Sequence, residues 1–457
     1  MDKRVYVNRT LNLKRIRYIG LDMDHTLIRY YTREFEKLSH SVMKEKLVRN
    51  KLYPQEVLDL PFEYDLTIRG LVIDRKRGNV LKLNRQGAIR ASYHGLNAID
   101  YKTQQKVYQS TYIDLGDPDY LAVDTSFSIS LATLFAQIVE LKRHKADIKL
   151  PDPATIADDV LDVLDEGHRD GSLKEIVKSD IKRFIIKDPE VVSGLEKFKQ
   201  HGKKIFILTN SDFHYTKMLL DYAINPFLKK NSTWQDLFEI VITSAQKPRF
   251  FHDDLKFLKV NFSDGTMTNF ADPLKPGIYQ GGSAKNFTKD LGLQGDEILY
   301  IGDHIYGDIL RLKKDSGWRT AMVIEELQGE VEANKKAQPI VDEIEQLMHR
   351  KEPLEDELTE LMTAKFEKET DAGCKRIEVL QEKITEIDSD ISQLIKKQQA
   401  MYNELWGQLM RAGNEESYFA HQVDRFACVY MAKLNDFFSL SPRTYFRAPR
   451  RPLAHEI

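Results

Sequence analysis

The sequence predicts an α/β protein whose core is a parallel sheet. Four short apolar runs, rich in β-branched residues, are each followed at once by polar side chains. Such runs are typical of strands that a parallel sheet buries on both faces. They lie in segments 18–28, 205–212, 241–248 and 298–308. Because open α/β sheets place their sites at the carboxyl ends of the strands, the polar residues after these runs are the candidate functional residues.

Segment 18–28 contributes two aspartates, Asp22 and Asp24, followed by Thr26. Side chains two apart on a strand point the same way, so we expect the two carboxylates to lie side by side. Like charges held together repel each other, and a hard cation or a shared proton relieves the repulsion. An acidic pair by itself has another explanation, which is that it caps the following helix.

The three later segments supply the other parts of a catalytic site. They end in Thr209 and Asn210, then Lys247, then the carboxylates Asp303 and Asp308. Each has an ordinary structural explanation, as a turn, a surface lysine or a solvated loop. All four strand ends together, in the order Asp/Asp, Thr/Asn, Lys and Asp/Asp, indicate one shared site.

This order resembles the motifs of the haloacid dehalogenase-like (HAD-like) phosphohydrolases. The resemblance implies a Rossmannoid core in which Asp22 is a nucleophile that forms an aspartyl-phosphate and Asp24 is the general acid and base. It further implies that the substrate phosphoryl group is contacted by Thr209, Asn210, Ser211 and Lys247. It implies that Mg²⁺ is bound by Asp22, Asp303 and the Asp24 carbonyl. Asp308 would orient Lys247 or a metal-bound water.

The residues make chemical sense without the family. A phosphate monoester carries about two negative charges at neutral pH, so an anionic nucleophile approaches it only if those charges are offset. Mg²⁺ suits an all-oxygen carboxylate site, and Lys247 adds a fixed positive charge. Catalysis would then consist mostly of positioning and electrostatics.

The composition argues against several other classes of protein. The chain has 457 residues, enough for two or three domains. Its 68 basic and 70 acidic side chains nearly cancel, so no overall charge points to nucleic acid or membrane. Cys374 and Cys428 fit no metal-ligand spacing and no disulfide framework. The sequence shows no apolar signal segment and no run of 18 apolar residues, so we expect a cytoplasmic protein.

The spacing of the motifs predicts an inserted domain. Asp22 and Thr209 lie 187 positions apart, far more than a βα connection needs. We expect a discontinuous core, 1–30 and 186–330, interrupted by a cap domain at 31–185. The predicted cap elements are a helix at 34–51, strands at 70–74 and 79–83, and helices at 126–143 and 153–165. A cap over the strand ends would exclude water and select the leaving group.

Residues 335–412 are expected to form an antiparallel helical hairpin or coiled coil. One arm has apolar residues at heptad spacing, and a looser seam precedes it. These seams are Ile377, Leu380, Ile384, Ile387, Ile391 and Leu394, and Ile344, Leu347, Leu354, Leu358 and Leu361. Asp371–Gly373 separates the arms. Two helices that pack only on each other and a coil that binds a partner both stay open.

We expect the last segment, 413–457, to pack back on the core. Its basic end, 447–452, is interpreted as a solvated or docked tail, with nucleic-acid binding the weaker alternative.

A closer resemblance is to the cytosolic purine 5'-nucleotidase group. It is carried by residues 19–26, 171–175, 209–212, 247–248, 300–310 and 419–426. The resemblance covers most of 15–325 and about 405–457, and the helical hairpin is the least matched part. It implies hydrolysis of purine nucleoside 5'-monophosphates, with inosine and guanosine monophosphate (IMP and GMP) preferred. It also implies phosphoryl transfer to nucleosides, activation by purine nucleotides, and a homotetramer.

Within that group a cap helix contacts the substrate, and Asp165, His168 and Lys174 match the contacting positions. His168 offers a flat ring for stacking, and Asp165 can accept a hydrogen bond from a purine N–H. The alternative is that all three are exposed helix residues. Leu161 replaces an arginine of the family, so the base preference stays open.

A purine nucleotide effector is expected at the border of cap and core. The matching positions are Arg69, Asn79, Tyr306, Lys314, Gln422 and Arg425. A tyrosine to stack a purine and cations to bind a polyphosphate form a sensible set. The alternative is that these residues only join cap, core and C-terminal segment.

Two other functions stay open. The chain could be a phosphatase, mutase or phosphotransferase for another small phosphomonoester. It could also be a scaffold that binds a partner through the hairpin, although the intact catalytic aspartates and lysine argue against a relic core.

Overall fold

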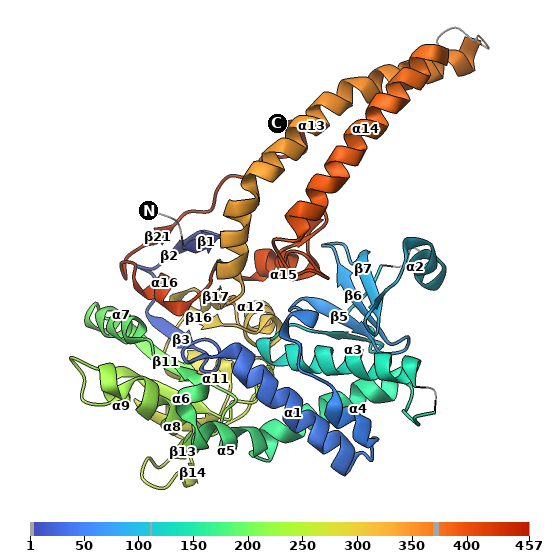
Figure 1. Ribbon diagram of the computed structural model, residues 1–457. Helices are drawn as coiled ribbons and strands as arrows, with labels where there is room; N and C mark the ends of the chain where they lie inside the picture. The colour runs from blue at the N-terminus through green and yellow to red at the C-terminus, as the bar shows by residue number, and fades with distance from the viewer. Residues whose placement is uncertain (1–3, 110–111, 146, 369–373, 457) are drawn as a thin grey trace. The chain divides into compact units, whose positions relative to one another are not determined.

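The computed structural model describes residues 4–109, 112–145, 147–368 and 374–456 (Figure 1). The chain falls into two units, one made of Met1–Glu325 with Met410–Ile457 and the other of Glu326–Leu409. The turn expected at 371–373 lies outside the described residues.

The first unit is built on a sheet of ten strands in the order β1-β20-β17-β16-β3-β11-β12-β15-β13-β14. The strands from β20 to β15 run parallel, and β1, β13 and β14 are antiparallel to their neighbours. Their bounds are β1 Val5–Val7, β3 Tyr18–Leu21, β11 Lys204–Leu208, β12 Ile240–Thr243, β13 Phe257–Val260, β14 Met267–Asn269, β15 Gly277–Gly281, β16 Ile298–Gly302, β17 Arg319–Val323 and β20 Val429–Met431. The predicted α/β fold with a parallel-sheet core is confirmed.

Alternate residues of the strands pack into two apolar cores, one on each face of the sheet. In β11, Ile205 and Ile207 belong to one core, and Phe206 and Leu208 belong to the other. This two-sided burial is why the strands appear as continuous apolar runs. The helices that contribute to the first core include α7 Pro189–Gln200, α8 Phe213–Ala223 and α16 Leu434–Phe438, and those of the second include α10 Arg249–His252, α11 Ala284–Asp290 and α12 Arg311–Asp315.

The segment between β3 and β11 contains a second, antiparallel sheet in the order β8-β7-β6-β5-β9. Its strands are β5 Leu71–Asp74, β6 Asn79–Leu83, β7 Ile89–His94, β8 Asn97–Ala98 and β9 Tyr120–Ala122. The helices of this cap are α1 Thr32–Asn50, α2 Tyr101–Tyr108, α3 Ile129–His144, α4 Pro153–Arg169, α5 Ser172–Ser179 and α6 Ile181–Phe184. Helix α4 runs past the expected end at residue 165, so His168 lies in its last turn.

The C-terminal segment becomes part of the core sheet. Strand β20 pairs in parallel with β17 and antiparallel with β1. Helix α15, Tyr418–Phe426, immediately precedes it, and β21, Tyr445–Phe446, pairs with β2, Leu11–Asn12, near the N-terminus.

The second unit is a pair of long helices, α13 Leu327–Lys368 and α14 Cys374–Gln399. The heptad residues Leu380, Ile387 and Ile391 are buried, and Lys351 on α13 pairs with Asp388 on α14 at 2.7 Å. Helix α13 begins at Leu327, earlier than the predicted boundary at 335. Among the described helices, none combines the length and the apolar character that crossing a membrane requires.

Candidate active site

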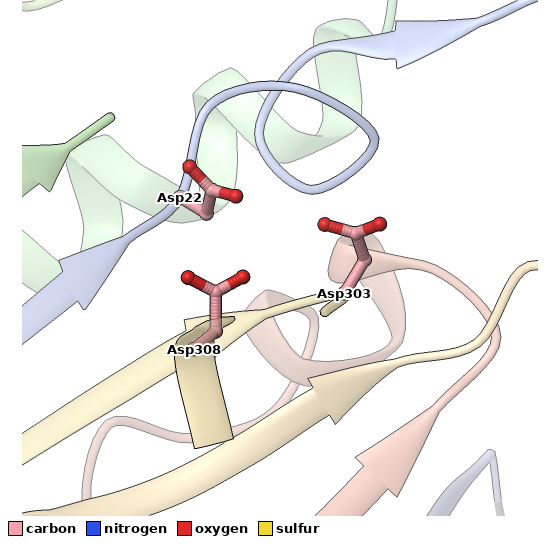
Figure 2. A group of neighbouring side chains, drawn as sticks. All are labelled: Asp22, Asp303 and Asp308. Carbon is pink, nitrogen blue, oxygen red and sulfur yellow. The ribbon is translucent and has the colours of Figure 1, made fainter. Parts of the chain in front are cut away.

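The carboxylates of three aspartates meet at the carboxyl edge of the core sheet (Figure 2). Asp22 follows β3 and Asp303 follows β16, and these two strands are neighbours. Oxygen atoms of Asp22, Asp303 and Asp308 all lie within 4.8 Å of one another. Asp308 returns to the strand end through a single π-helical turn, Ile305–Leu310, a rare geometry that is frequent at functional sites.

Gly302, the last residue of β16, makes room for this return. A Cβ atom at position 302 would lie 2.5 Å from Oδ2 of Asp308, closer than any side chain tolerates. The glycine therefore lets the Asp308 carboxylate approach the strand backbone.

Lys247 supplies the positive charge of the cluster. Its Nζ lies 2.7 Å from Oδ1 of Asp22 and 2.7 Å from Oδ1 of Asp308. Burial alone would lower the pKa of Lys247, but the two carboxylates raise it above its usual value, so the ammonium stays charged. Burial, and then the charge of Asp308, raise the pKa of Asp22 and raise that of Asp303 to about 7.

The donor set fits a hard divalent cation. One lysine faces three buried carboxylates, and every ligand atom is oxygen, which suits Mg²⁺. Oδ2 of Asp303 is buried and has no hydrogen-bond partner among the described residues. A cation beside Asp303 would satisfy this oxygen and offset the negative charge.

The carboxylate of Asp24 has different partners from that of Asp22. It accepts hydrogen bonds from Tyr30 Oη at 2.6 Å and from Ser211 Oγ at 2.8 Å. The repulsion that the sequence predicted between Asp22 and Asp24 instead acts on Asp22 from Asp308 and Asp303. The reason is that β3 ends at Leu21, so the two aspartates no longer follow strand geometry.

The other motif residues hold this arrangement in place. Asn210 brackets the Lys247 backbone, since its Oδ1 accepts from Lys247 N at 2.6 Å and its Nδ2 donates to Lys247 O at 3.1 Å. Thr209 is buried, and its Oγ1 accepts from Ser211 N at 3.0 Å.

Sequence reasoning missed Tyr300, which lies inside β16. Its hydroxyl accepts from Lys247 Nζ at 3.1 Å and donates to Leu208 O at 3.0 Å. A tyrosine in a fully buried strand needs a hydrogen-bond partner for its hydroxyl. The tyrosine in this apolar run could therefore have indicated a polar contact at the site.

Two cap residues expected to bind substrate lie near residues of the core motifs. Lys174 Nζ pairs with Asp212 of the core at 2.6 Å. Burial raises the pKa of Asp24, and the charge of Lys174 is among the weaker effects that oppose this rise. Burial, and then Lys174, lower the pKa of His168 to about 4, so its ring is neutral. Asp165 is exposed on α4, and none of the described contacts joins it to the catalytic side chains.

Sequence reasoning also missed Phe127, a cap residue whose ring contacts both helix α4 and the first motif, residues 18–28. Its ring centroid is 5.2 Å from that of His168 and 4.6 Å from that of His25. The three rings form an aromatic wall next to Asp24. No periodic pattern marks Phe127, because it lies in a short turn before α3.

The residues expected to bind an effector fall into separate groups. Tyr306 and Gln422 line one apolar cavity of about 10 Å³, which is room for about one water molecule. Arg69 Nη1 donates to the backbone oxygen of Asp303 at 3.1 Å. Asn79 Nδ2 donates to Tyr108 Oη at 2.8 Å, which occupies its amide inside the cap. Lys314 and Arg425 both lie over the ring of Phe426.

The parallel sheet and the side chains at its carboxyl edge have the arrangement that the four sequence motifs predicted. Among solved structures, the chain is similar to a haloacid dehalogenase-like family hydrolase from Xanthomonas campestris (9% identity over 67% of this chain and 82% of that chain, TM-score 0.25). It is also similar to an L-2-haloacid dehalogenase from Xanthobacter autotrophicus (11% identity over 68% and 78%, TM-score 0.23). At such low TM-scores these matches carry no argument.

The chain belongs to the 5' nucleotidase family, whose model matches residues 5–457. It is 27% identical to a 5'-nucleotidase domain-containing protein of Dictyostelium discoideum, over 99% of this chain and 75% of that protein. The predicted family and the predicted enzyme class, a 5'-nucleotidase that hydrolyses phosphoric monoesters, are confirmed.

Proposed function

We propose that the enzyme hydrolyses purine nucleoside 5'-monophosphates in a Mg²⁺-dependent reaction that passes through an aspartyl-phosphate on Asp22. The observation that carries this proposal is the buried cluster in which Lys247 bridges Asp22 and Asp308 next to Asp303. An anionic nucleophile, a fixed ammonium and further carboxylates at one sheet edge are the parts that phosphoryl transfer needs.

In the first step a carboxylate oxygen of Asp22 attacks phosphorus, and the bond from phosphorus to the ribose oxygen breaks. Asp24 gives its proton to that leaving oxygen. In the second step Asp24 takes a proton from a water molecule as this water attacks the aspartyl-phosphate. Inorganic phosphate leaves, and the Asp22 carboxylate is regenerated.

The surroundings of Asp24 support this exchange of protons. Burial raises the pKa of Asp24, while the hydrogen bonds from Tyr30 and Ser211 lower it and fix the position of the carboxylate. Burial and hydrogen bonding thus shift the pKa of this carboxyl group in opposite directions. Such a group can hold a proton in one step and release it in the other.

Asp22 and Asp303, with the backbone carbonyl of Asp24, would hold Mg²⁺, which when bound offsets the charge of the carboxylates and of the phosphoryl group. Asp308 would orient Lys247, with which it pairs at 2.7 Å. Lys247 and the groups around Thr209, Asn210 and Ser211 would bind the phosphoryl oxygens. Asn210 contributes by fixing the Lys247 backbone.

The aromatic wall supports a purine substrate. The rings of His168 and His25 each meet the ring of Phe127 nearly at right angles. His25 is buried, whereas Phe127 and His168 are partly exposed and offer ring surface near Asp24, with the charge of Lys174 close by. A neutral His168 ring stacks on a base without the cost of desolvating a charge. We also propose that IMP and GMP are the preferred purine substrates. The substrate panel must test this preference separately, because Leu161 stands where the family has arginine.

A substrate panel tests the proposal. Phosphate release in Mg²⁺ would be measured for purine and pyrimidine nucleoside 5'-monophosphates and for a sugar phosphate, with and without a purine triphosphate. We expect purine substrates to be at least about tenfold better in kcat/KM, which corresponds to roughly 1.4 kcal/mol. Equal rates for the sugar phosphate would favour the alternative of another small phosphomonoester. Transfer to a nucleoside, activation by a nucleotide and a tetrameric assembly stay predictions.

A further inference from the structure

A group of cations lies at the edge of the core sheet opposite the catalytic aspartates. Asp22 and Asp303 follow the last residues of β3 and β16, whereas Arg15 precedes β3 and Arg319 is the first residue of β17. These strands run parallel. Four or five residues at roughly 3.3 Å each place the two edges about 15 Å apart. The cations therefore belong to a different site.

Arg15 and Arg319 line a cavity of about 250 Å³. The other lining residues are Thr10, Leu11, Asn12, Ile16, Asp296 and Tyr445. One wall is the pair of short strands β2 and β21, which are labelled near the N mark in Figure 1. Ligand pockets usually measure roughly 300–1,000 Å³, so this cavity suits a small ligand.

The two arginines pair with no carboxylate among the described residues. Arg319 donates to the backbone oxygen of Thr10, and no described hydrogen bond or ion pair uses the Arg15 side chain. The Oδ1 of Asn12 accepts from Lys14 N at 3.1 Å, while its amide nitrogen has no described partner. Two guanidinium groups and an amide are thus available as donors, a set that suits a phosphate group.

Two further cations belong to nearby parts of the chain: Lys203 contacts a lining residue, and Arg9 precedes the lining residue Thr10 in the sequence. Their recorded partners are neutral backbone oxygens. Lys203 Nζ donates to the backbone oxygen of Ile16, a lining residue, at 2.5 Å. Arg9 Nη1 donates to the backbone oxygen of Asp424 at 2.6 Å. Asp296 is the single carboxylate among the lining residues. The summed positive charge would attract an anion to this edge of the sheet.

We infer that this cavity is a second phosphate-binding site, which takes inorganic phosphate or the phosphate group of a small ester. Arg15 and Arg319 bind the phosphate oxygens, and the amide of Asn12 adds a donor. The ring of Tyr445, which is 49% exposed, offers an apolar face for the rest of an ester. This site is independent of the catalytic chemistry proposed above.

Equilibrium dialysis of the full chain with radiolabelled inorganic phosphate tests the inference. The buffer contains a chelator and little salt, so that Asp22, Asp303 and Asp308 repel phosphate and the catalytic site contributes little. We expect saturable binding of one phosphate per chain. Arg15→Gln should weaken this binding by about tenfold or more, and Arg15→Lys, which keeps the charge, should weaken it less.

Arg17→Gln is the matched control. Arg17 is an exposed arginine two positions away that pairs with Glu297 at 3.3 Å and does not line the cavity. We expect native phosphate affinity in this variant. Because Arg15 is exposed and unpaired among the described residues, its variants should keep the native melting temperature.

Competition distinguishes the two sources of phosphate. A nucleoside 5'-monophosphate that displaces the label at lower concentration than unlabelled phosphate identifies an ester as the better ligand. Displacement only at higher concentration identifies inorganic phosphate. The inference is overturned if binding is not saturable, if Arg15→Gln binds as the native protein does, or if Arg17→Gln weakens binding equally. A protein inactive on every nucleotide would leave this result unaffected.

Discussion

Replacing Asp24 with asparagine removes the proposed proton donor and leaves the proposed nucleophile, Asp22, in place. Asparagine has the same shape, its carbonyl can accept from Tyr30 Oη, and its amide can donate to Ser211 Oγ. Both native hydrogen bonds, at 2.6 and 2.8 Å, can therefore be replaced. We expect the free energy of unfolding to change by no more than about 1–3 kcal/mol.

The catalytic loss should be larger and should depend on the leaving group. A positioned general acid contributes roughly 10²–10⁴ in rate, which is about 2.7–5.5 kcal/mol of activation free energy. A ribose oxygen is a poor leaving group, comparable to water with a pKa of about 15.7, whereas a phenol has a pKa of about 10. We expect Asp24→Asn to slow phosphoenzyme formation by roughly 10²–10⁴ with a nucleoside monophosphate and by less than about tenfold with phenyl phosphate.

Single-turnover rapid quench of phosphoenzyme formation, with both substrates, measures these losses, and circular dichroism checks the fold. Tyr30→Phe is the companion variant. The hydrogen bond from Tyr30 lowers the pKa of Asp24, so its removal raises that pKa and extends formation of the phosphoenzyme to higher pH. Equal fractional losses for both substrates in Asp24→Asn would refute the acid role.

Four other outcomes follow from the site. Asp22→Asn should leave less than about one per cent of phosphate release with unchanged circular dichroism, and greater retention would remove Asp22 as the nucleophile. A chelator should abolish activity, with Ca²⁺ a poor substitute because its larger shell misplaces the nucleophile, whereas full activity after dialysis against chelator would contradict a metal requirement. His168→Ala should raise KM for a purine monophosphate by about tenfold and leave phenyl phosphate kinetics unchanged, and equal effects on both would argue against base stacking. Tyr306→Ala should weaken activation by a purine triphosphate, measured as turnover at low substrate, and no activation of the native protein would make the Tyr306 cavity purely structural.

The sequence predicted the core, and the edge at which the candidate catalytic residues meet, because both depend on local patterns. A strand buried on two faces needs a continuous apolar run, and parallel strands bring their carboxyl ends to one edge. Asp22, Lys247, Asp303 and Asp308 meet for this reason. Their spacing along the chain does not matter, because β16, β3 and β12 all belong to the parallel part of one sheet and end at the same edge.

Contacts that depend on tertiary geometry could not be predicted in this way. The Asp24 carboxylate has Tyr30 and Ser211 as hydrogen-bond partners because β3 ends before Asp24. The alternation of residues along the sequence does not indicate at which residue a strand ends. Phe127 comes from a cap turn more than a hundred residues after the first motif, so only the folded chain places it beside His168.

Arg69 shows why the expected effector positions need the structure to be understood. It comes from the cap, is almost fully buried, and donates to the backbone oxygen of Asp303, a carboxylate of the catalytic cluster. Tyr306 lies between Asp303 and Asp308 in the chain and closes a cavity with Gln422 that holds about one water molecule. A purine can enter there only if cap and core separate locally, and that separation would act on Asp303 through Arg69. A ligand that prefers the separated form by about 1.4 kcal/mol would shift the balance between the two forms tenfold. If a nucleotide binds at this border, as we propose, the contact of Arg69 with the backbone of Asp303 would link its binding to the carboxylate cluster.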